Sequence, residues 1–77
     1  MGAYIELKLF ASLKTYLPQG AAHFPITSGE RVEALIKRLG IPPDEVKLIF
    51  VNGVKAQISS ILGGGERVGI FPPVGGG

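Results

Sequence analysis

The sequence has 77 residues, which is enough for one small domain and too few for two. Hydrophobic residues make up 45% of it and charged residues 18%, so the composition is not that of a disordered chain. There is no Cys and only one His, which excludes disulfides and thiolate nucleophiles and argues strongly against an all-protein zinc site. The net charge is only +2, with eight cations scattered among six anions, which argues against nucleic-acid binding.

The hydropathy pattern also argues against a membrane protein. The longest run of bulky apolar residues, at 48–51, is far shorter than the ~20 residues a membrane helix needs. The N-terminus lacks the basic and apolar segments of a signal peptide. Together with the absence of Cys, this leads us to expect a cytoplasmic protein.

The first part of the chain predicts two strands. Residues 3–10 alternate, which predicts a strand that buries one face, made of Ile5, Leu7 and Leu9. A short helical turn is expected at residues 11–17. A weak strand follows at residues 21–26, where Pro25 indicates the edge of a sheet.

The clearest helix signal begins at Thr27. Thr27 and Glu30 have the spacing of a capping box. Four apolar residues then recur on one helical stripe: Val32, Leu35, Ile36 and Leu39. Gly40 is placed to end the helix in the left-handed conformation, and two prolines at 42–43 prevent its continuation. The predicted helix can therefore cover one face of a sheet.

The second half predicts a hairpin and a last strand. A short helical start is expected at residues 43–46, and a strand at residues 47–51. Asn52-Gly53 favours a tight turn into a returning strand at residues 54–56. The three glycines at 63–65 predict a turn, because a phosphate-binding loop would need Gly-Lys-Ser/Thr and a following helix. A last strand is predicted at residues 68–71, and its alternation places Phe71 on the face opposite Val68 and Ile70.

This order of elements predicts an α+β fold of the β-grasp type. We expect a mixed sheet of four to five strands packed on one main helix, formed by residues 1–71. Residues 72–77 are expected to form a flexible, extended tail, since two prolines and a glycine run fit neither a helix nor a central strand.

Three segments of the sequence carry a family resemblance. The run LGGGERVGIFPPVGG at residues 62–76 resembles the C-terminal motif of the ubiquitin-like sulfur carriers of the MoaD/ThiS family, which ends in Phe-Pro-Pro-Val-x-Gly-Gly. The run LFASLK at residues 9–14 is similar to the MoaD-type N-terminal motif, and VNG at residues 51–53 matches the hairpin of the family. The resemblance runs through nearly the whole chain and implies a ubiquitin-like β-grasp.

The resemblance implies that the reactive group is a C-terminal carboxylate. The family ends in a Gly-Gly pair preceded by a small residue, whereas this sequence ends in three glycines. If Gly75 is the small residue, Gly76 and Gly77 form the pair and Gly77 carries the reactive carboxylate; otherwise Gly77 is extra and must be trimmed. Phe71 takes the position of a Phe at the family's partner interface, and the partner-binding segment continues through the next four residues: Pro72, Pro73, Val74 and Gly75.

The resemblance also implies the partners. An E1-like adenylyltransferase of the MoeB/ThiF type would use ATP-Mg to adenylate the carboxylate. A sulfur donor such as a cysteine desulfurase would then supply sulfur for a thiocarboxylate. An acceptor synthase, such as the large subunit of molybdopterin synthase, would use that sulfur. The motifs favour molybdopterin or tungstopterin synthesis over thiamine thiazole. The chain itself would be a protein substrate that binds no metal or cofactor, or the small subunit of such a synthase.

Two other functions stay open on the sequence alone. The chain could be a ubiquitin-like protein modifier or interaction module that takes no part in sulfur transfer. A nucleic-acid-binding β-grasp is the third possibility, and the scattered charge makes it the least favoured.

Overall fold

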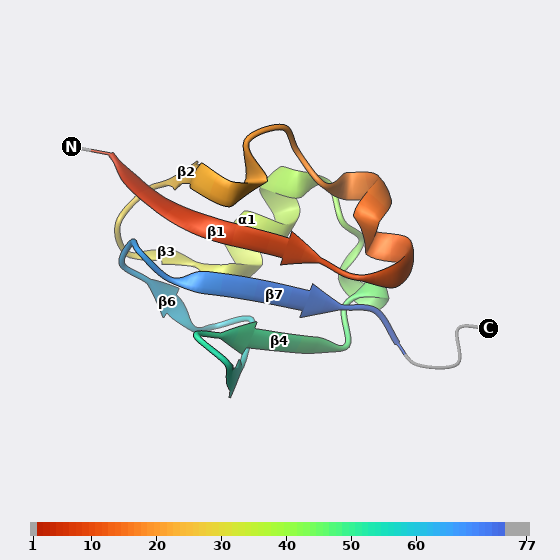
Figure 1. The fold of residues 1–77 in the computed structure, drawn as a ribbon. Coiled ribbons are helices and arrows are strands. Elements are labelled where there is room, and N and C mark those ends of the chain that lie inside the picture. The colour runs from red at the N-terminus through yellow and green to blue at the C-terminus, as the bar shows by residue number, and fades with distance from the viewer. Residues whose placement is uncertain (1, 74–77) are drawn as a thin grey trace.

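A computed structural model describes residues 2–73, and these form two layers, a five-stranded mixed sheet and one α-helix packed on one of its faces (Figure 1). The strand order is β2-β1-β7-β4-β5. The strands are β1 (Ala3–Leu9), β2 (Phe24–Ile26), β4 (Leu48–Val51), β5 (Val54–Ala56) and β7 (Arg67–Phe71). The expected α+β, ubiquitin-like β-grasp is confirmed.

The two central strands, β1 and β7, come from opposite ends of the chain and run parallel. Leu7 lies beside Val68, and Leu9 beside Ile70. The other pairs in this sheet are antiparallel: β2 with β1, β4 with β7, and β5 with β4. The parallel register brings the ends of β1 and β7 to the same end of the sheet, which positions the segment that follows β7.

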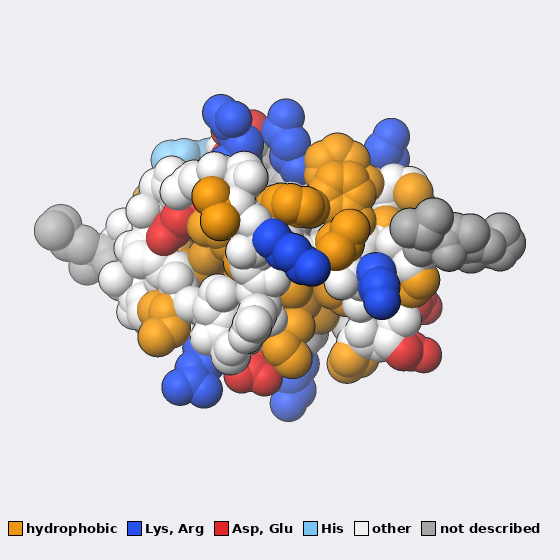
Figure 2. All heavy atoms as spheres, turned by 90° about the horizontal axis from the view of Figure 1, so that it is seen from below, with side chains coloured by type: hydrophobic (Ala, Val, Ile, Leu, Met, Phe, Trp, Pro, Cys, Tyr) orange, Lys and Arg blue, Asp and Glu red, His pale blue; other side chains and the backbone are white. Residues whose placement is uncertain are grey.

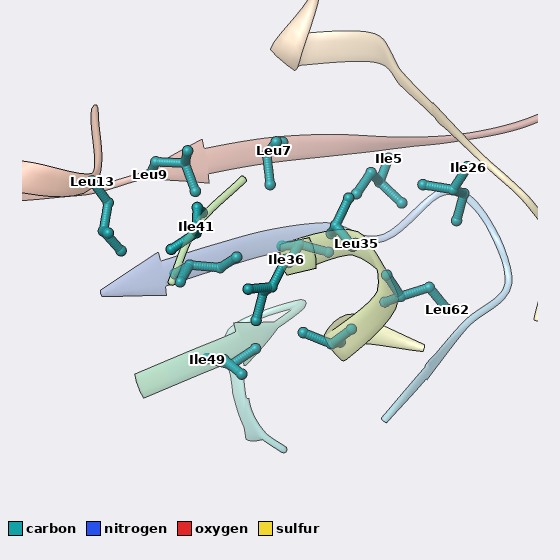
Figure 3. Packing of buried hydrophobic residues seen from close by; sticks show 13 residues of the cluster. Ile5, Leu7, Leu9, Leu13, Ile26, Leu35, Ile36, Ile41, Ile49 and Leu62 are labelled. Carbon is teal, nitrogen blue, oxygen red and sulfur yellow. The ribbon is translucent and has the colours of Figure 1, made fainter. Parts of the chain in front are cut away.

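The core lies between the sheet and the helix α1 (Val32–Leu39) (Figure 3). β1 contributes the alternating residues predicted from the sequence, and α1 contributes its apolar stripe, of which Leu39 is only partly buried. The thirteen buried hydrophobic residues are Ile5, Leu7, Leu9, Leu13, Ile26, Val32, Leu35, Ile36, Ile41, Ile49, Leu62, Val68 and Ile70. No polar or charged residue of the described chain is buried with them.

The helix begins later than the capping box predicted. The N–H of Thr27 does donate to the Glu30 carboxylate (3.0 Å), but this bond closes a turn ahead of the helix. The next two residues form a strand, β3 (Glu30–Arg31), that pairs with β6 (Ile61–Leu62). The helix therefore starts at Val32, after this second, two-stranded sheet. It ends as predicted, because Gly40 has a φ of 80° and its N–H donates to the carbonyl of Lys37.

Three short 3-10 helices connect the strands: η1 (Ala11–Tyr16), η2 (Ala21–His23) and η3 (Pro43–Glu45). The first and third match the predicted helical turns. The second corrects the predicted strand at residues 21–26, of which only Phe24–Ile26 pairs with β1. Gly20 adopts a φ of 75° and accepts a hydrogen bond from the N–H of His23, so the segment curls before it reaches the sheet edge.

The hairpin between β4 and β5 confirms its prediction. Asn52 and Gly53 both have positive φ, 54° and 79°, as the mirror-image turn of a tight hairpin requires.

Over residues 2–73, no helix has the length and hydropathy to cross a membrane.

Candidate functional site

The candidate site begins where β7 ends. β7 is hydrogen-bonded on both sides up to its last residue. The N–H of Phe10 donates to the carbonyl of Ile70 (3.2 Å), and the N–H of Lys47 donates to the carbonyl of Phe71 (2.8 Å). Pro72 and Pro73 then continue outside any regular element. Because proline lacks an N–H, it cannot extend the ladder, so the prolines end the strand at Phe71.

Three phenylalanines gather beside this exit, on the face of the sheet that α1 leaves uncovered. The rings of Phe10 and Phe71 are stacked, with centroids 4.1 Å apart and planes 2° from parallel. The ring of Phe50 meets Phe71 edge-on, with centroids 5.6 Å apart and an angle of 82°. Offset stacks and edge-on pairs are the favoured aromatic geometries. All three side chains are half-buried, so they present an apolar surface to solvent.

The structure places Phe71 on the predicted face. Val68 and Ile70 are fully buried against the helix layer, and Phe71 points to the other side. Pro72 is half-buried and Pro73 is exposed, directly beyond the aromatic cluster. The other predicted site residues lie outside the described residues: Val74, Gly75, Gly76 and Gly77. The roles of these residues in partner binding and activation stay predictions.

Phe10 and Phe50 also belong to the site, although neither is among the predicted site residues. Phe10 lies in the LFASLK motif at residues 9–14. The signal was present, because Phe10 continues the solvent-facing side of β1 after Glu6 and Lys8. Phe50 comes near Phe71 through the β4–β7 register, which pairs Phe50 with Gly69. No local pattern specifies that long-range register.

A rigid turn precedes β7 at its other end. The carboxylate of Glu66 accepts hydrogen bonds from the N–H groups of Gly63 (2.8 Å) and Gly64 (2.7 Å). Burial alone would raise the pKa of Glu66, but these two donors, together with the N–H of Glu66 itself, outweigh it and hold the pKa below its ordinary value. The glycine run is thus a turn, as predicted. The two N–H groups that an anion would need are already occupied by Glu66.

Among residues 2–73, no cluster of three or more His, Asp or Glu side chains could hold a metal ion. The single His, His23, stacks on Tyr4 with ring centroids 3.9 Å apart, and this pair lies on β1 and η2. The described residues at the exit present an apolar surface, formed by Phe10, Phe50 and Phe71.

Comparison with known proteins identifies the family. The model of the Mut7-C ubiquitin family matches residues 2–75, nearly the entire chain. The chain belongs to the Mut7-C ubiquitin family. No curated protein is significantly similar to it.

Solved structures place this Mut7-C ubiquitin protein among MoaD-like proteins. A putative molybdopterin converting factor subunit 1 from Pyrococcus furiosus is 27% identical with a TM-score of 0.66, over 94% of this chain and 99% of that one. SAMP1 from Haloferax volcanii is 25% identical with a TM-score of 0.65, over 97% of this chain and 100% of SAMP1. The HVO 2177 protein of Haloferax volcanii has a TM-score of 0.75, over 99% of this chain and 88% of that protein. Its sequence identity is 24%, so this similarity supports the fold alone.

The family match and the solved structures together give the general class of the protein. The Mut7-C ubiquitin chain has the ubiquitin-like fold shared by small carrier and modifier proteins, and it is of that kind rather than an enzyme.

Proposed function

We propose that the chain is a sulfur carrier whose terminal glycine carboxylate is activated by adenylation and then converted to a thiocarboxylate. The observation that carries the proposal is the run Pro-Pro-Val-Gly-Gly-Gly directly after β7 of a ubiquitin-like fold. Glycines lack side chains, so such a segment can enter a narrow active site. The similarity to a putative molybdopterin converting factor subunit supports this proposal.

The chemistry needs nothing from the chain beyond the carboxylate. A carboxylate oxygen of Gly77 attacks the α-phosphorus of ATP in the active site of an E1-like enzyme, and pyrophosphate leaves. A sulfur nucleophile, written here as hydrosulfide, attacks the acyl carbon of the adenylate, and AMP leaves with the original oxygen. The product is a thiocarboxylate, and one proton is released. Adenylation is required because an unactivated carboxylate is a poor electrophile.

We further propose that the sulfur is used in cofactor biosynthesis. Molybdopterin or tungstopterin is the first candidate pathway, and thiamine thiazole the next. The named activity of the Pyrococcus furiosus neighbour supports the first of these. The partners would be an E1-like adenylyltransferase, a sulfur donor such as a cysteine desulfurase, and an acceptor synthase.

A second candidate function is protein modification. SAMP1 is a small archaeal modifier protein, and it shares this fold and 25% identity. In that case the activated glycine would be transferred to a lysine amine, with AMP as the leaving group, and an amide would form instead of a thiocarboxylate.

Intact-mass spectrometry separates the two functions. The chain is incubated with an E1-like adenylyltransferase, ATP-Mg and sulfide, in the presence and absence of a protein extract. A mass gain equal to the exchange of one oxygen for sulfur, confined to the C-terminal fragment, supports the carrier. Amide-linked conjugates that form without that exchange support the modifier. Failure to form either product with several adenylating enzymes contradicts both functions.

A further inference from the structure

A groove runs along one side of α1, on the helix side of the sheet. Its volume is about 900 Å³. Its most deeply buried lining residues are Ile36 and Ile41, each 3% exposed. Apart from Glu33 and Lys37, every residue that lines it is apolar. We call it the α1 groove.

Ile58 projects at the end of the groove where α1 begins. It is a large apolar residue, yet it is 51% exposed. The carbonyl of Ile58 accepts a hydrogen bond from the N–H of Glu33 (2.8 Å), and the carbonyl of Ser60 accepts one from the N–H of Val32 (2.9 Å). The first turn of a helix leaves these N–H groups without partners inside the helix. The two bonds therefore tie the loop to α1 and fix the place of Ile58.

The other end of the groove is open above Gly40. This residue ends α1 with a φ of 80°, and a Cβ built on it would meet no heavy atom of another segment within 4 Å. Gly40 follows Glu33 by seven positions, which corresponds to about 10 Å along a helix axis. The groove thus has an apolar projection at one end and an open recess at the other.

The two charged residues of the groove have opposite signs and lie one helical turn apart. Glu33 is in the first turn of α1 and Lys37 in the last. Glu33 forms an exposed pair with Arg31, at 3.9 Å, and such pairs are weak. Within residues 2–73, no acidic side chain forms an ion pair with Lys37. Both charges are therefore available to a molecule that enters the groove.

The surface charge argues against a strongly charged partner at this groove. In the view of Figure 2, side chains of both signs are spread around the outline of the molecule, and hydrophobic side chains lie between them. The groove itself carries one charge of each sign. A nucleic acid or a strongly acidic protein would meet no concentrated opposite charge there.

We infer that the α1 groove is the interface of a symmetric homodimer. A two-fold axis that passes between Glu33 and Lys37 makes the two copies of α1 antiparallel, and each contact then occurs twice. Ile58 of each copy lies over Gly40 of the other, and Glu33 of each copy lies beside Lys37 of the other. The projection, the recess and the two opposite charges thus complement a second copy of the same surface.

This dimer goes beyond the proposed function and does not depend on it. Phe71 and the end of β7 lie on the opposite face of the sheet, so they stay accessible in both copies. The interface is small, because α1 has only eight residues. Small interfaces belong to weak and transient complexes, so we expect a dimer that forms only at high protein concentration.

Sedimentation equilibrium of the full chain, between about 10 µM and about 1 mM, measures the dimerisation constant. Charge reversal on α1 tests the antiparallel arrangement. We expect Glu33→Lys and Lys37→Glu each to weaken dimerisation about tenfold, since symmetry turns each change into two like-charge contacts. The double variant restores both opposite-charge contacts and should dimerise like the wild-type chain.

Thermal unfolding separates this effect from helix stability. Both charge reversals oppose the helix dipole, so the double variant should have the lowest melting temperature of the three. Recovery of the dimer without recovery of stability is therefore specific to the interface. Lys55→Glu on β5 makes the same change of charge as Lys37→Glu and should leave dimerisation unchanged.

Ile58→Ser tests the projection. We expect it to weaken dimerisation at least tenfold, because it removes the apolar anchor of both halves of the interface. The backbone carbonyl that caps α1 is kept, so the monomer should stay folded. Val54→Ser is the matched control, since Val54 is 68% exposed on β5 and does not line the groove.

Four outcomes would overturn the proposal. The first is a chain that stays monomeric up to about 1 mM. The second is a dimer that survives Ile58→Ser and Lys37→Glu but is lost in Lys55→Glu, since it would form through β5. The third is a loss of dimer in both single charge variants that the double variant does not reverse. The last is a monomeric chain that binds anilinonaphthalene sulfonate and loses the dye in Ile58→Ser, which would assign the groove to a different apolar partner.

Discussion

The ring of Phe10 lies flat on the ring of Phe71, although the two residues are 61 positions apart in the sequence. The parallel β1–β7 register explains the contact, because it brings the C-terminal ends of both strands to one place. The N–H of Phe10 also donates to the carbonyl of Ile70. The first strand of the chain therefore supports the position from which the last segment leaves.

The stacked pair should show measurable coupling. We expect Phe10→Leu and Phe71→Leu each to lower the free energy of unfolding, because each removes one ring of the stack. In a double-mutant cycle the two changes should be coupled by about 0.5–1.5 kcal/mol, as for other aromatic pairs. Urea unfolding of the four proteins measures this coupling. Strictly additive losses would show that the rings are neighbours without a stacking contribution.

The hairpin turn offers a second prediction, at Asn52. Its side-chain oxygen accepts a hydrogen bond from the N–H of Arg67 (3.0 Å), and its own N–H donates to the carbonyl of Arg67 (2.8 Å). Asn52→Gly keeps the positive φ accessible but removes the side-chain bond, at a cost of about 0.5–1 kcal/mol, and also raises the conformational entropy of the unfolded chain. Asn52→Ala removes the same bond and places at this φ a residue that tolerates the left-handed region less well than asparagine, which costs about 1–2 kcal/mol.

Thermal unfolding of both Asn52 variants checks the assignment. The alanine variant should melt at the lower temperature, because the strain of alanine in the left-handed region exceeds the extra conformational entropy that glycine loses on folding. An alanine variant that melts at a higher temperature than the glycine variant would contradict the account, because it would mean that the positive φ of residue 52 imposes little strain.

The Glu66 turn gives the chain a predictable acid sensitivity. The pKa of Glu66 is lowered in the folded state, despite partial burial, by the N–H groups of Gly63 and Gly64. A lowered folded-state pKa means that the stabilisation is fully present above the unfolded-state pKa. It is lost as the pH falls through the folded-state pKa.

The variant Glu66→Gln isolates this contribution. Near neutral pH it should be less stable than the wild-type chain by about 1 kcal/mol, the low end for a bond to a charged group because the side chain is partly exposed. The two proteins should approach equal stability as the pH falls through the acidic range. Urea midpoints measured from neutral to acidic pH test this, and a stability gap independent of pH would contradict the account.

The parts of the fold that the sequence predicted are those with a local signal. The helical stripe around Leu35, the Asn52-Gly53 turn and the alternation of β1 each rest on spacing within one element. β3 and β6 were missed because two-residue strands such as Glu30–Arg31 are too short to show a period. The capping box at Thr27 predicted a start of the helix that is too early. Its hydrogen bond to Glu30 forms, but residues 30–31 pair with β6 before the helix begins.

In the candidate site, too, local patterns predicted some features, and long-range strand pairing decided the others. The face on which Phe71 lies followed from the alternation of β7, because Val68 and Ile70 had to be buried. The neighbours of Phe71 did not follow, since they come from β1 and β4 through registers set by the whole sheet. The sequence does contain two local signals of the site. The alternation of β1 continues to Phe10 on the solvent-facing side. Gly69 is the other, because a glycine inside an otherwise regular strand often indicates a close approach.

The terminal glycine gives the most direct test of the proposed function. Removing Gly77 should abolish the exchange of oxygen for sulfur. The carboxylate of Gly76 would then end one residue short of the ATP that is bound in the active site of the adenylating enzyme. The melting temperature should not change, because every buried hydrophobic residue of the described chain lies between Ile5 and Ile70. Intact-mass spectrometry and thermal unfolding of the same preparation measure the two effects.

A matched variant separates chemistry from length. Gly77→Ala keeps the length and a terminal carboxylate but adds a methyl group at the reacting residue, so it should reduce the exchange through steric exclusion while the fold stays intact. If the chain that ends at Gly76 is activated as well as the full chain, Gly77 is the extra residue and Gly75-Gly76 is the functional pair. A truncated chain that melts at a much lower temperature would instead show that the tail takes part in the fold.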